Sequence, residues 1–132
     1  MPWSVDLHDA FVPEFEALEE VVPDELLAHI AVLETFGPQL RRPRVDTLNG
    51  SRHANMKELR FDAAHGVWRF AFAFDRKRKG IVLCGGDKSG GSERRFYRQL
   101  IAKADERFDA HLVAIEPSGT QRDRSKNRKR RS

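Results

Sequence analysis

Three cationic side chains lie inside apolar segments that the sequence predicts to be β-strands: Lys57, Arg60 and Arg69. The stretch KELRFDAAHGVWRFAFAF, residues 57–74, is typical of two strands joined by a short turn. Arginine suits phosphate particularly well, because its planar guanidinium group donates two parallel hydrogen bonds. These residues therefore indicate a phosphate-binding surface. The alternative is a solvated sheet face that carries scattered charges.

Because successive strand side chains point to opposite faces, the second strand of this pair divides into two kinds of surface. One face is aromatic and suits packing beneath helices: Trp68, Phe70, Phe72 and Phe74. The other face carries small and charged residues: Arg69, Ala71, Ala73 and Asp75. We expect this second face to be a shallow exposed groove in which Arg69 meets Arg60. Lys57 has the opposite parity to Arg60, so it reaches that face only at a frayed strand start or across a bulge.

Further basic residues are placed where we expect them to extend this positive field along a phosphate backbone. Lys88 follows the next strand, and the turn between strands is Arg76-Lys77-Arg78-Lys79. Tyr97 falls near the apolar stripe of the last helix, where a core position is favoured over base stacking. The five histidines show no HExxH spacing and no cysteine partners, so we predict no metal site and no cofactor.

The elements that must position these residues follow from hydrophobic periodicity and turn signals. We expect a strand at 3–7, a hairpin of two helices within 8–21 and 23–36, and a loop at 38–55 with one short extended segment at 45–48. Strands at 56–61, 67–75 and 80–85 and a helix from Ser92 to about Leu112 complete the order. This β-α-α-β-β-β-α order predicts an α+β fold with a mostly antiparallel four-stranded sheet.

Length and charge bound the class of protein. A chain of 132 residues with 39% apolar and 33% charged residues fits one globular domain, which we place at residues 1–116. The net charge of +4 divides into −9 for residues 1–40, +7 for 41–116 and +6 for 117–132, and this last segment we predict to be a disordered basic tail. Such asymmetry favours a polyanion partner. The single cysteine, Cys84, and the lack of a signal peptide or membrane span predict a cytoplasmic protein.

The order of these segments resembles RelE/HigB-type toxins, in particular the phage-derived HigB-like branch of the RelE/ParE superfamily. The resemblance covers about residues 3–113 and is carried by VDTLNGSRHANMKELRF, VWRFAFAFD, IVLCGGDKS and FYRQLIAKADERFDAHL. It implies the toxin of a type II toxin–antitoxin system, which enters the ribosomal A site and cuts mRNA without a metal. It also implies a cognate antitoxin, often a helix-turn-helix DNA-binding protein.

By position, the resemblance makes Lys57, Arg60, Arg69 and Lys88 the catalytic residues. Lys57 is then the candidate base, Arg60 and Arg69 hold the phosphate, and Lys88 is the candidate acid. Arg76 to Lys79 and Tyr97 are candidate RNA-binding residues. The segment GGDKSGGSE departs from the F-x-K-K-T-x-K-T-P of relatives and lacks two lysines. Two other functions stay open: a ParE-like inhibitor of DNA gyrase and a non-catalytic nucleic-acid-binding module.

Overall fold

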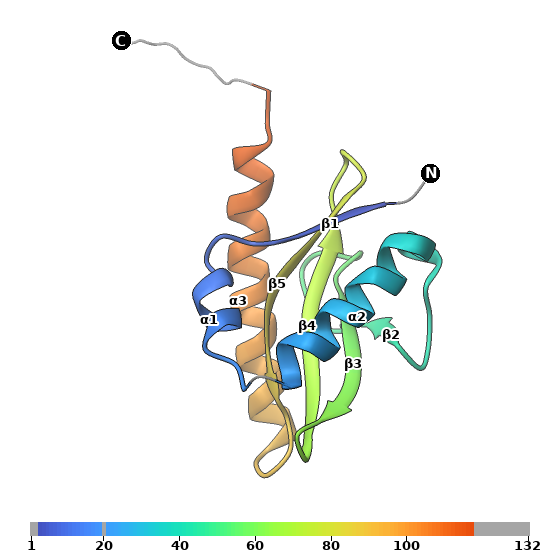
Figure 1. The fold of residues 1–132 in the computed structure, drawn as a ribbon. Helices are drawn as coiled ribbons and strands as arrows, with labels where there is room; N and C mark the ends of the chain where they lie inside the picture. The colour runs from blue at the N-terminus through green and yellow to red at the C-terminus, as the bar shows by residue number, and fades with distance from the viewer. Residues whose placement is uncertain (1–2, 20, 118–132) are drawn as a thin grey trace.

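The computed structural model describes residues 3–19 and 21–117, so the basic tail predicted at 117–132 lies, apart from Pro117, outside the described residues. The elements follow one another as shown in Figure 1: β1 (Ser4–Leu7), α1 (Val12–Glu16), α2 (Val21–Phe36), the 3-10 turn η1 (Gly37–Gln39), β2 (Val45–Thr47), β3 (Lys57–Ala63), β4 (Gly66–Phe74), β5 (Lys79–Asp87) and α3 (Glu93–Ala114).

The sheet has five strands in the order β1-β5-β4-β3-β2. β1 runs parallel to β5, and the other neighbouring pairs are antiparallel. The predicted mostly antiparallel α+β architecture is confirmed, whereas the predicted count of four strands is wrong. The additional strand is β2, which forms within the segment expected to be only locally extended. It is fixed because Val45 is buried in the core and the Arg60 N–H donates to the Arg44 carbonyl at 2.8 Å.

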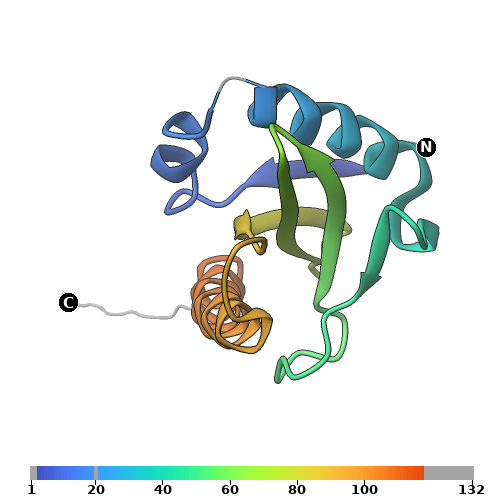
Figure 2. The same cartoon turned by 90° about the horizontal axis from the view of Figure 1, so that it is seen from below.

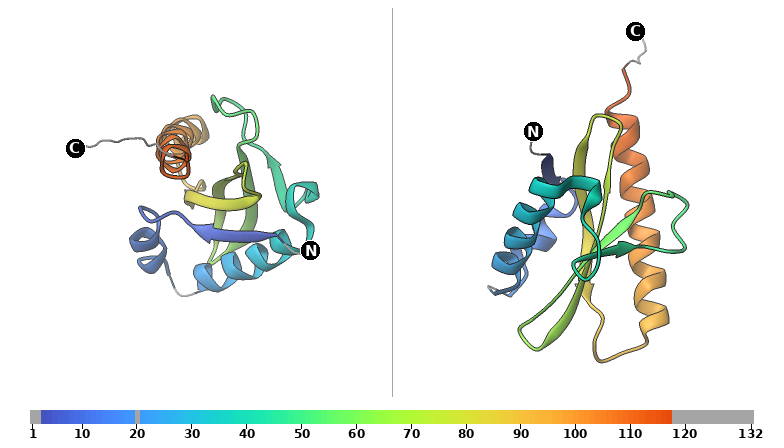
Figure 3. Two further views of the ribbon diagram at one scale, coloured as in Figure 1. Left: turned by 90° about the horizontal axis from the view of Figure 1, so that it is seen from above. Right: turned by 90° about the vertical axis from the view of Figure 1, so that its right-hand side faces the viewer.

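Helices cover both faces of the sheet, as Figure 2 and both views of Figure 3 show. On one face, α1 and α2 pack on the aromatic side of β4, and Phe70 and Phe72 are fully buried there. On the other face, α3 packs through its own apolar stripe of Leu100, Ala104 and Phe108. The sheet is therefore the middle layer between two hydrophobic cores.

The expectation of an open, alanine-floored groove is wrong. Ala71 and Ala73 have no exposed surface, because the apolar stripe of α3 lies over them. Small side chains in the sheet let a helix approach closely, so the alanines mark a packing surface. A bulge at Leu83 turns both Leu83 and Cys84 toward this same core.

The predicted starts of α2 and α3 agree with the structure, whereas the predicted extent of the first helix does not. The Ser92 hydroxyl caps α3 by accepting a hydrogen bond from the Arg95 N–H at 3.2 Å, and Pro23 lies in the first turn of α2. The first helix is much shorter than the segment 8–21, since α1 spans only Val12–Glu16. None of the helices in the described residues is long and apolar enough to cross a membrane.

Candidate functional site

Arg60 and Arg69 lie directly opposite each other on β3 and β4, on the α3 side of the sheet. The predicted meeting of these two arginines is therefore confirmed. Glu58, on the same face of β3, stands between them. Its carboxylate oxygens lie 3.9 Å from the Nε of Arg60 and 4.0 Å from the Nε of Arg69. The cluster is thus two guanidinium groups around one carboxylate.

The two arginines differ in exposure, and the prediction that Arg69 is solvent-facing is wrong. The Arg69 side chain is 8% exposed, whereas that of Arg60 is 32% exposed. Arg69 donates one hydrogen bond to the Trp68 carbonyl at 2.8 Å. The buried Nε of each arginine has no hydrogen-bond partner within the described residues. Each of these Nε atoms instead lies at ion-pair distance from the Glu58 carboxylate, 3.9 Å for Arg60 and 4.0 Å for Arg69.

Access to this cluster comes from an open hollow of about 250 Å³ at the edge of the sheet. Pro43, Arg60, Phe61, Asp62 and Arg69 line the hollow. β2 ends its pairing at the β3 residue Leu59, and the cis peptide bond before Pro43 lies just beyond that end. The short length of β2 therefore leaves Arg60 at an accessible edge.

Tyr97 and Glu58 form a pair that links the site to the α3 core. The Tyr97 hydroxyl donates to the Glu58 carboxylate at 2.8 Å, and its ring packs with the buried residues beneath α3. Burial is the main cause that raises the pKa of Glu58, although Tyr97 and the two arginines oppose it. Burial and the neighbouring carboxylate raise the pKa of Tyr97 to about 12. Tyr97 is therefore both a core residue and a site residue.

Glu58 is the site residue that sequence reasoning missed. A signal for it was present, because Glu58 shares the parity of Arg60 and lies two residues before it. Alternation along the strand does not show whether such a carboxylate is buried, so the sequence alone offered no reason to assign Glu58 a catalytic role. The burial that shifts its pKa becomes visible only when α3 is placed over the sheet.

Lys88 lies near the same cluster, in the segment that precedes α3. Its backbone N–H donates to the Val67 carbonyl at 2.8 Å, and its ammonium group contacts Glu93 at 2.9 Å. The hydrogen bond from Lys88 is the main cause that lowers the pKa of Glu93, and the charge of Arg69 contributes as well. The positive charge of Arg69 thus helps to lower the pKa of both Glu58 and Glu93. Three of the four predicted catalytic residues therefore lie in one neighbourhood: Arg60, Arg69 and Lys88.

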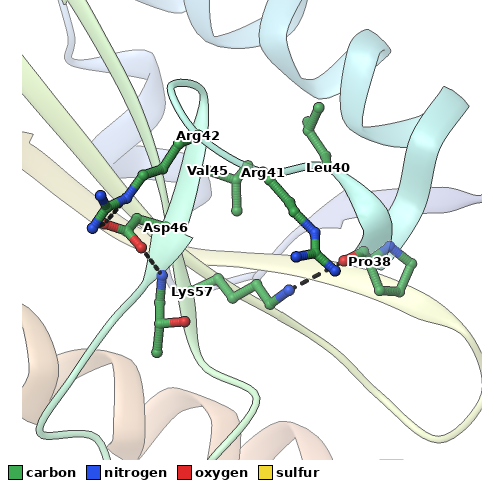
Figure 4. Close-up of a pocket in the computed structure, with 8 residues that line it drawn as sticks. Pro38, Leu40, Arg41, Arg42, Val45, Asp46 and Lys57 are labelled. Atoms are coloured by element: carbon green, nitrogen blue, oxygen red, sulfur yellow. Dashed lines mark hydrogen bonds and ion pairs between the residues drawn. The ribbon is translucent and has the colours of Figure 1, made fainter.

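Lys57 is the predicted catalytic residue that the structure separates from the others. It pairs with Phe72, so its side chain lies on the α2 face of the sheet, where its ammonium group donates to the Pro38 carbonyl at 3.2 Å. Figure 4 shows Lys57 and Arg41 pointing toward the same place beside Pro38, and Arg42 turned to Asp46. The hollow they line measures about 500 Å³. No bulge brings Lys57 to the arginine cluster, because the β3–β4 register is regular.

The basic turn Arg76 to Lys79 is remote from the cluster. It joins β4 to β5 at one end of the sheet, whereas Lys88 and the start of α3 lie at the opposite end (Figure 1). Arg78 stacks over Trp3 at 4.1 Å, and Lys79 pairs with Asp6 at 3.1 Å. Arg76 and Lys77 are exposed. The C-terminal end of α3 lies at the same end of the molecule as this turn (Figures 1 and 3).

Metal-ligating groups and the single thiol are the other side chains with a capacity for chemistry. Within residues 3–19 and 21–117, no group of three or more His, Cys, Asp or Glu side chains is arranged to hold a metal ion. Cys84 is 1% exposed, and burial raises its pKa to about 12. It therefore stays a thiol near neutral pH and fits the predicted role of a small buried core residue.

The chain matches one protein-family model and several known proteins. Residues 13–109 match the family described as phage derived protein Gp49-like. The chain is 38% identical to the candidate toxin HigB2 of Mycobacterium tuberculosis, over 94% of this chain and 61% of HigB2. It is 41% identical to the candidate toxin HigB3 of the same organism, over 80% of this chain and 90% of HigB3. The chain therefore spans about three fifths of the length of HigB2.

Two solved structures share its fold. One is the Escherichia coli toxin RelE in the free state, as a mutant, with a TM-score of 0.60, 13% sequence identity, and coverage of 81% of this chain and 98% of RelE. The other comes from the archaeal RelE–RelB complex of Pyrococcus horikoshii, with a TM-score of 0.50, 19% identity, and coverage of 69% and 100%. At these identities the likeness establishes the RelE-like fold alone.

Proposed function

This chain belongs to the Gp49/HigB-like family of toxins, and we propose that it is a ribosome-dependent endoribonuclease that cuts mRNA and is neutralised by a cognate antitoxin. The observation that carries the proposal is the cluster of Arg60 and Arg69 around Glu58, with Lys88 nearby. The chemical class is attack of a ribose 2′-hydroxyl on the adjacent phosphorus. That attack forms a 2′,3′-cyclic phosphate and releases the 5′-oxygen of the next nucleotide.

The arginines suit the charge that this reaction develops. The phosphorus passes through a state with an extra negative charge on its oxygens, and preformed guanidinium groups stabilise it. Arg60 is the side chain that meets the incoming phosphate, because it is partly exposed in the edge hollow. Arg69 lies deeper, directly opposite Arg60, and adds its positive charge from within the sheet.

Glu58 replaces Lys57 as the proposed base. Lys57 lies on the opposite face of β3, so it does not reach a phosphate held by Arg60 and Arg69. A general base works best when its pKa lies near the working pH. Burial raises the pKa of Glu58 toward that range, and the Tyr97 hydroxyl holds the carboxylate in place.

Lys88 is the proposed acid that protonates the leaving 5′-oxygen. In the free protein its ammonium group is paired with Glu93, whose side chain is 65% exposed. The Lys88 side chain is 19% exposed, so the pair is open to solvent mainly on its Glu93 side, where an RNA phosphate competes for the ammonium group. The lysines that relatives carry in this segment are absent here, and Lys88 alone supplies the positive charge within Asp87–Ser92.

The remaining basic residues are assigned to binding. Lys57 with Arg41 and Arg42 provides one phosphate-binding hollow, and the turn at Arg76 and Lys77 provides another contact to ribosomal or messenger RNA. The partners are thus the ribosome with its mRNA and an antitoxin, which in this family is often a helix-turn-helix protein. All of this chemistry takes place in the cytoplasm.

The test is induction of the chain alone in a bacterial host, followed by mapping of mRNA 5′ ends within minutes. We expect growth arrest and new 5′ ends inside translated regions, and neither with the Glu58→Gln variant at equal protein level. The same cells report on DNA supercoiling. If no new ends appear while supercoiling collapses, the gyrase-inhibitor alternative replaces the nuclease.

A further inference from the structure

Helix α2 is apolar on more of its circumference than the sheet covers. Ten of its sixteen residues are Val, Leu, Ala, Ile or Phe, yet only Val22, Leu26, Ile30 and Leu33 are buried. Val21, Leu27 and Phe36 are 52%, 49% and 54% exposed. A surface helix of a monomeric protein usually has a polar outer face, so this surplus indicates a surface that is covered in another state.

Part of this surplus forms an apolar stripe beside the sheet edge, interrupted at one turn by Glu25. Val21, Ala28, Val32 and Phe36 recur at helical spacing along α2, which lies across the sheet in Figure 1. Ala28 and Val32 line an open groove of about 590 Å³ between α2 and the segment that precedes β2. The stripe runs the length of the sixteen-residue helix, roughly 24 Å at the usual rise per residue.

The two walls of the groove carry opposite charges. Glu25 lies on the α2 wall, and Arg44 and Arg60 lie on the opposite wall next to Pro43. Its lining between the walls is aromatic and aliphatic: the His29 ring stacks on Phe61 with ring centroids 4.7 Å apart, next to Ala28 and Val32. Such a lining between an acidic and a basic wall defines both the kind of ligand and its orientation.

We infer that this groove is the docking site for an amphipathic helix of a protein partner. The helix inserts apolar side chains against Ala28 and Val32, directs carboxylates to Arg44 and Arg60, and directs a basic side chain to Glu25. The small side chain of Ala28 allows the two helices to approach closely. The identity of the partner as the antitoxin rests on the proposed function, whereas the docking surface rests on the groove alone.

Occupation of the groove also blocks the arginine cluster. Pro43, Arg60 and Phe61 line both this groove and the hollow that leads to Arg69. A partner carboxylate bound to Arg60 therefore occupies the position of the RNA phosphate. Inhibition follows without any rearrangement of α3.

A protein segment fits this groove better than RNA does. The first forty residues, which include α2, carry nine acidic side chains and no lysine or arginine. Of these, Asp24, Glu25 and Glu34 lie on α2, and Glu25 lines the groove, where its negative charge repels a phosphate on the α2 wall. The exposed valine, alanine and phenylalanine side chains offer RNA neither a hydrogen-bond donor nor a positive charge.

The experiment uses the full chain and the purified product of the gene adjacent to its own, with binding measured by calorimetry. The groove variant is Ala28→Arg. Ala31→Arg is the matched control, because Ala31 is exposed on the same helix but does not line the groove. We expect Ala28→Arg to weaken binding about 30-fold or more, the loss typical of an interface centre, and Ala31→Arg to change it less than about 3-fold.

A charge exchange provides a second arm. Arg44→Glu should weaken binding, and restoration by a Glu→Lys change in the partner helix would fix the orientation. Absence of binding between the two proteins, or equal binding by the two α2 variants, overturns the inference. Loss of affinity for a 12-nucleotide RNA in Ala28→Arg, with partner binding intact, assigns the groove to nucleic acid instead. A chain that binds its partner as described but cuts no mRNA refutes the proposed function and leaves the docking site standing.

Discussion

The Arg69→Ala variant tests whether the arginine cluster is a buried charge network. Arg69 and Glu58 both have side chains that are 8% exposed, and their nearest charged atoms lie 4.0 Å apart. Removal of the guanidinium leaves the Glu58 carboxylate buried with Tyr97 and with Arg60, whose Nε lies 3.9 Å away and whose side chain is more exposed. Breaking one side of a buried ion pair is costly, because the remaining charge keeps its desolvation penalty.

The magnitude follows from the geometry. At 4.0 Å and an effective dielectric constant of about 20, two unit charges attract each other by roughly 4 kcal/mol. Arg60 stays at 3.9 Å, and Glu58 escapes part of the penalty by binding a proton. We therefore expect Arg69→Ala to lower the free energy of unfolding by about 3 kcal/mol at pH 7.5, or roughly 10 °C in Tm for a domain of this size.

The loss should also depend on pH. Burial raises the pKa of Glu58, and Arg69 is one of the charges that oppose this. The variant should therefore raise that pKa further. A carboxyl whose pKa is raised by folding contributes stability that is full below its unfolded pKa of about 4.3 and is lost as pH rises through the folded pKa. The destabilisation by Arg69→Ala should accordingly be smaller at pH 5 than at pH 7.5, because protonation of Glu58 removes the buried unpaired charge.

Urea unfolding of the parent, Arg69→Ala, Glu58→Gln and the double variant at pH 7.5 and pH 5 measures these quantities. Arg76→Ala is the matched control, because it removes an exposed arginine from the same β4–β5 hairpin. Glu58→Gln should be neutral or stabilising at pH 7.5, and it should cancel most of the loss in the double variant. An Arg69→Ala protein as stable as the parent, or equally destabilised at both pH values, would refute the buried network.

Three further outcomes are expected. Arg60→Ala should lower kcat for ribosome-dependent mRNA cleavage by about 10²–10³-fold, whereas Lys77→Ala at the remote turn should raise KM with kcat nearly unchanged. Tyr97→Phe should cost about 1–2 kcal/mol in urea unfolding, because the Glu58 carboxylate loses its 2.8 Å donor, and should move the acidic limb of the cleavage–pH profile to higher pH. Cys84 should resist alkylation at pH 8 in the folded protein and react only on unfolding, since its pKa is raised to about 12; labelling at the rate of a free thiol would show that α3 does not cover it.

Local sequence signals were sufficient for most of the fold. The turn between β3 and β4, the Ser92 cap and the apolar stripe of α3 are each set by residues close together in the chain, and all were predicted. β2 was harder to predict because three residues carry little periodicity. Its pairing depends on Val45 fitting a core that the rest of the chain builds.

The strand pairing of the site was predictable for the same reason. Alternation along β3 and β4, together with the short turn, places Arg60 opposite Arg69 without knowledge of any helix. Alternation also separates Lys57 from Arg60, since the two residues are three positions apart. The family resemblance grouped Lys57 with the arginines, and the parity of the strand was the better guide to its face.

Exposure was not predictable from the strands, because it depends on which element covers each face. The sequence Arg-Phe-Ala-Phe-Ala has one large and one small face, and a small face suits either an open groove or a closely packed helix. In this protein α3 covers the small face. Its apolar stripe of Leu100, Ala104 and Phe108 packs on Ala71 and Ala73, because their small side chains allow close approach. That same packing buries Glu58 and Arg69 beside Tyr97, which shifts the pKa of the carboxyl. The chemistry proposed for this cluster therefore depends on a helix that begins more than twenty residues after Arg69, and mutations beneath α3 should alter the pKa of Glu58 without touching the strands that carry it.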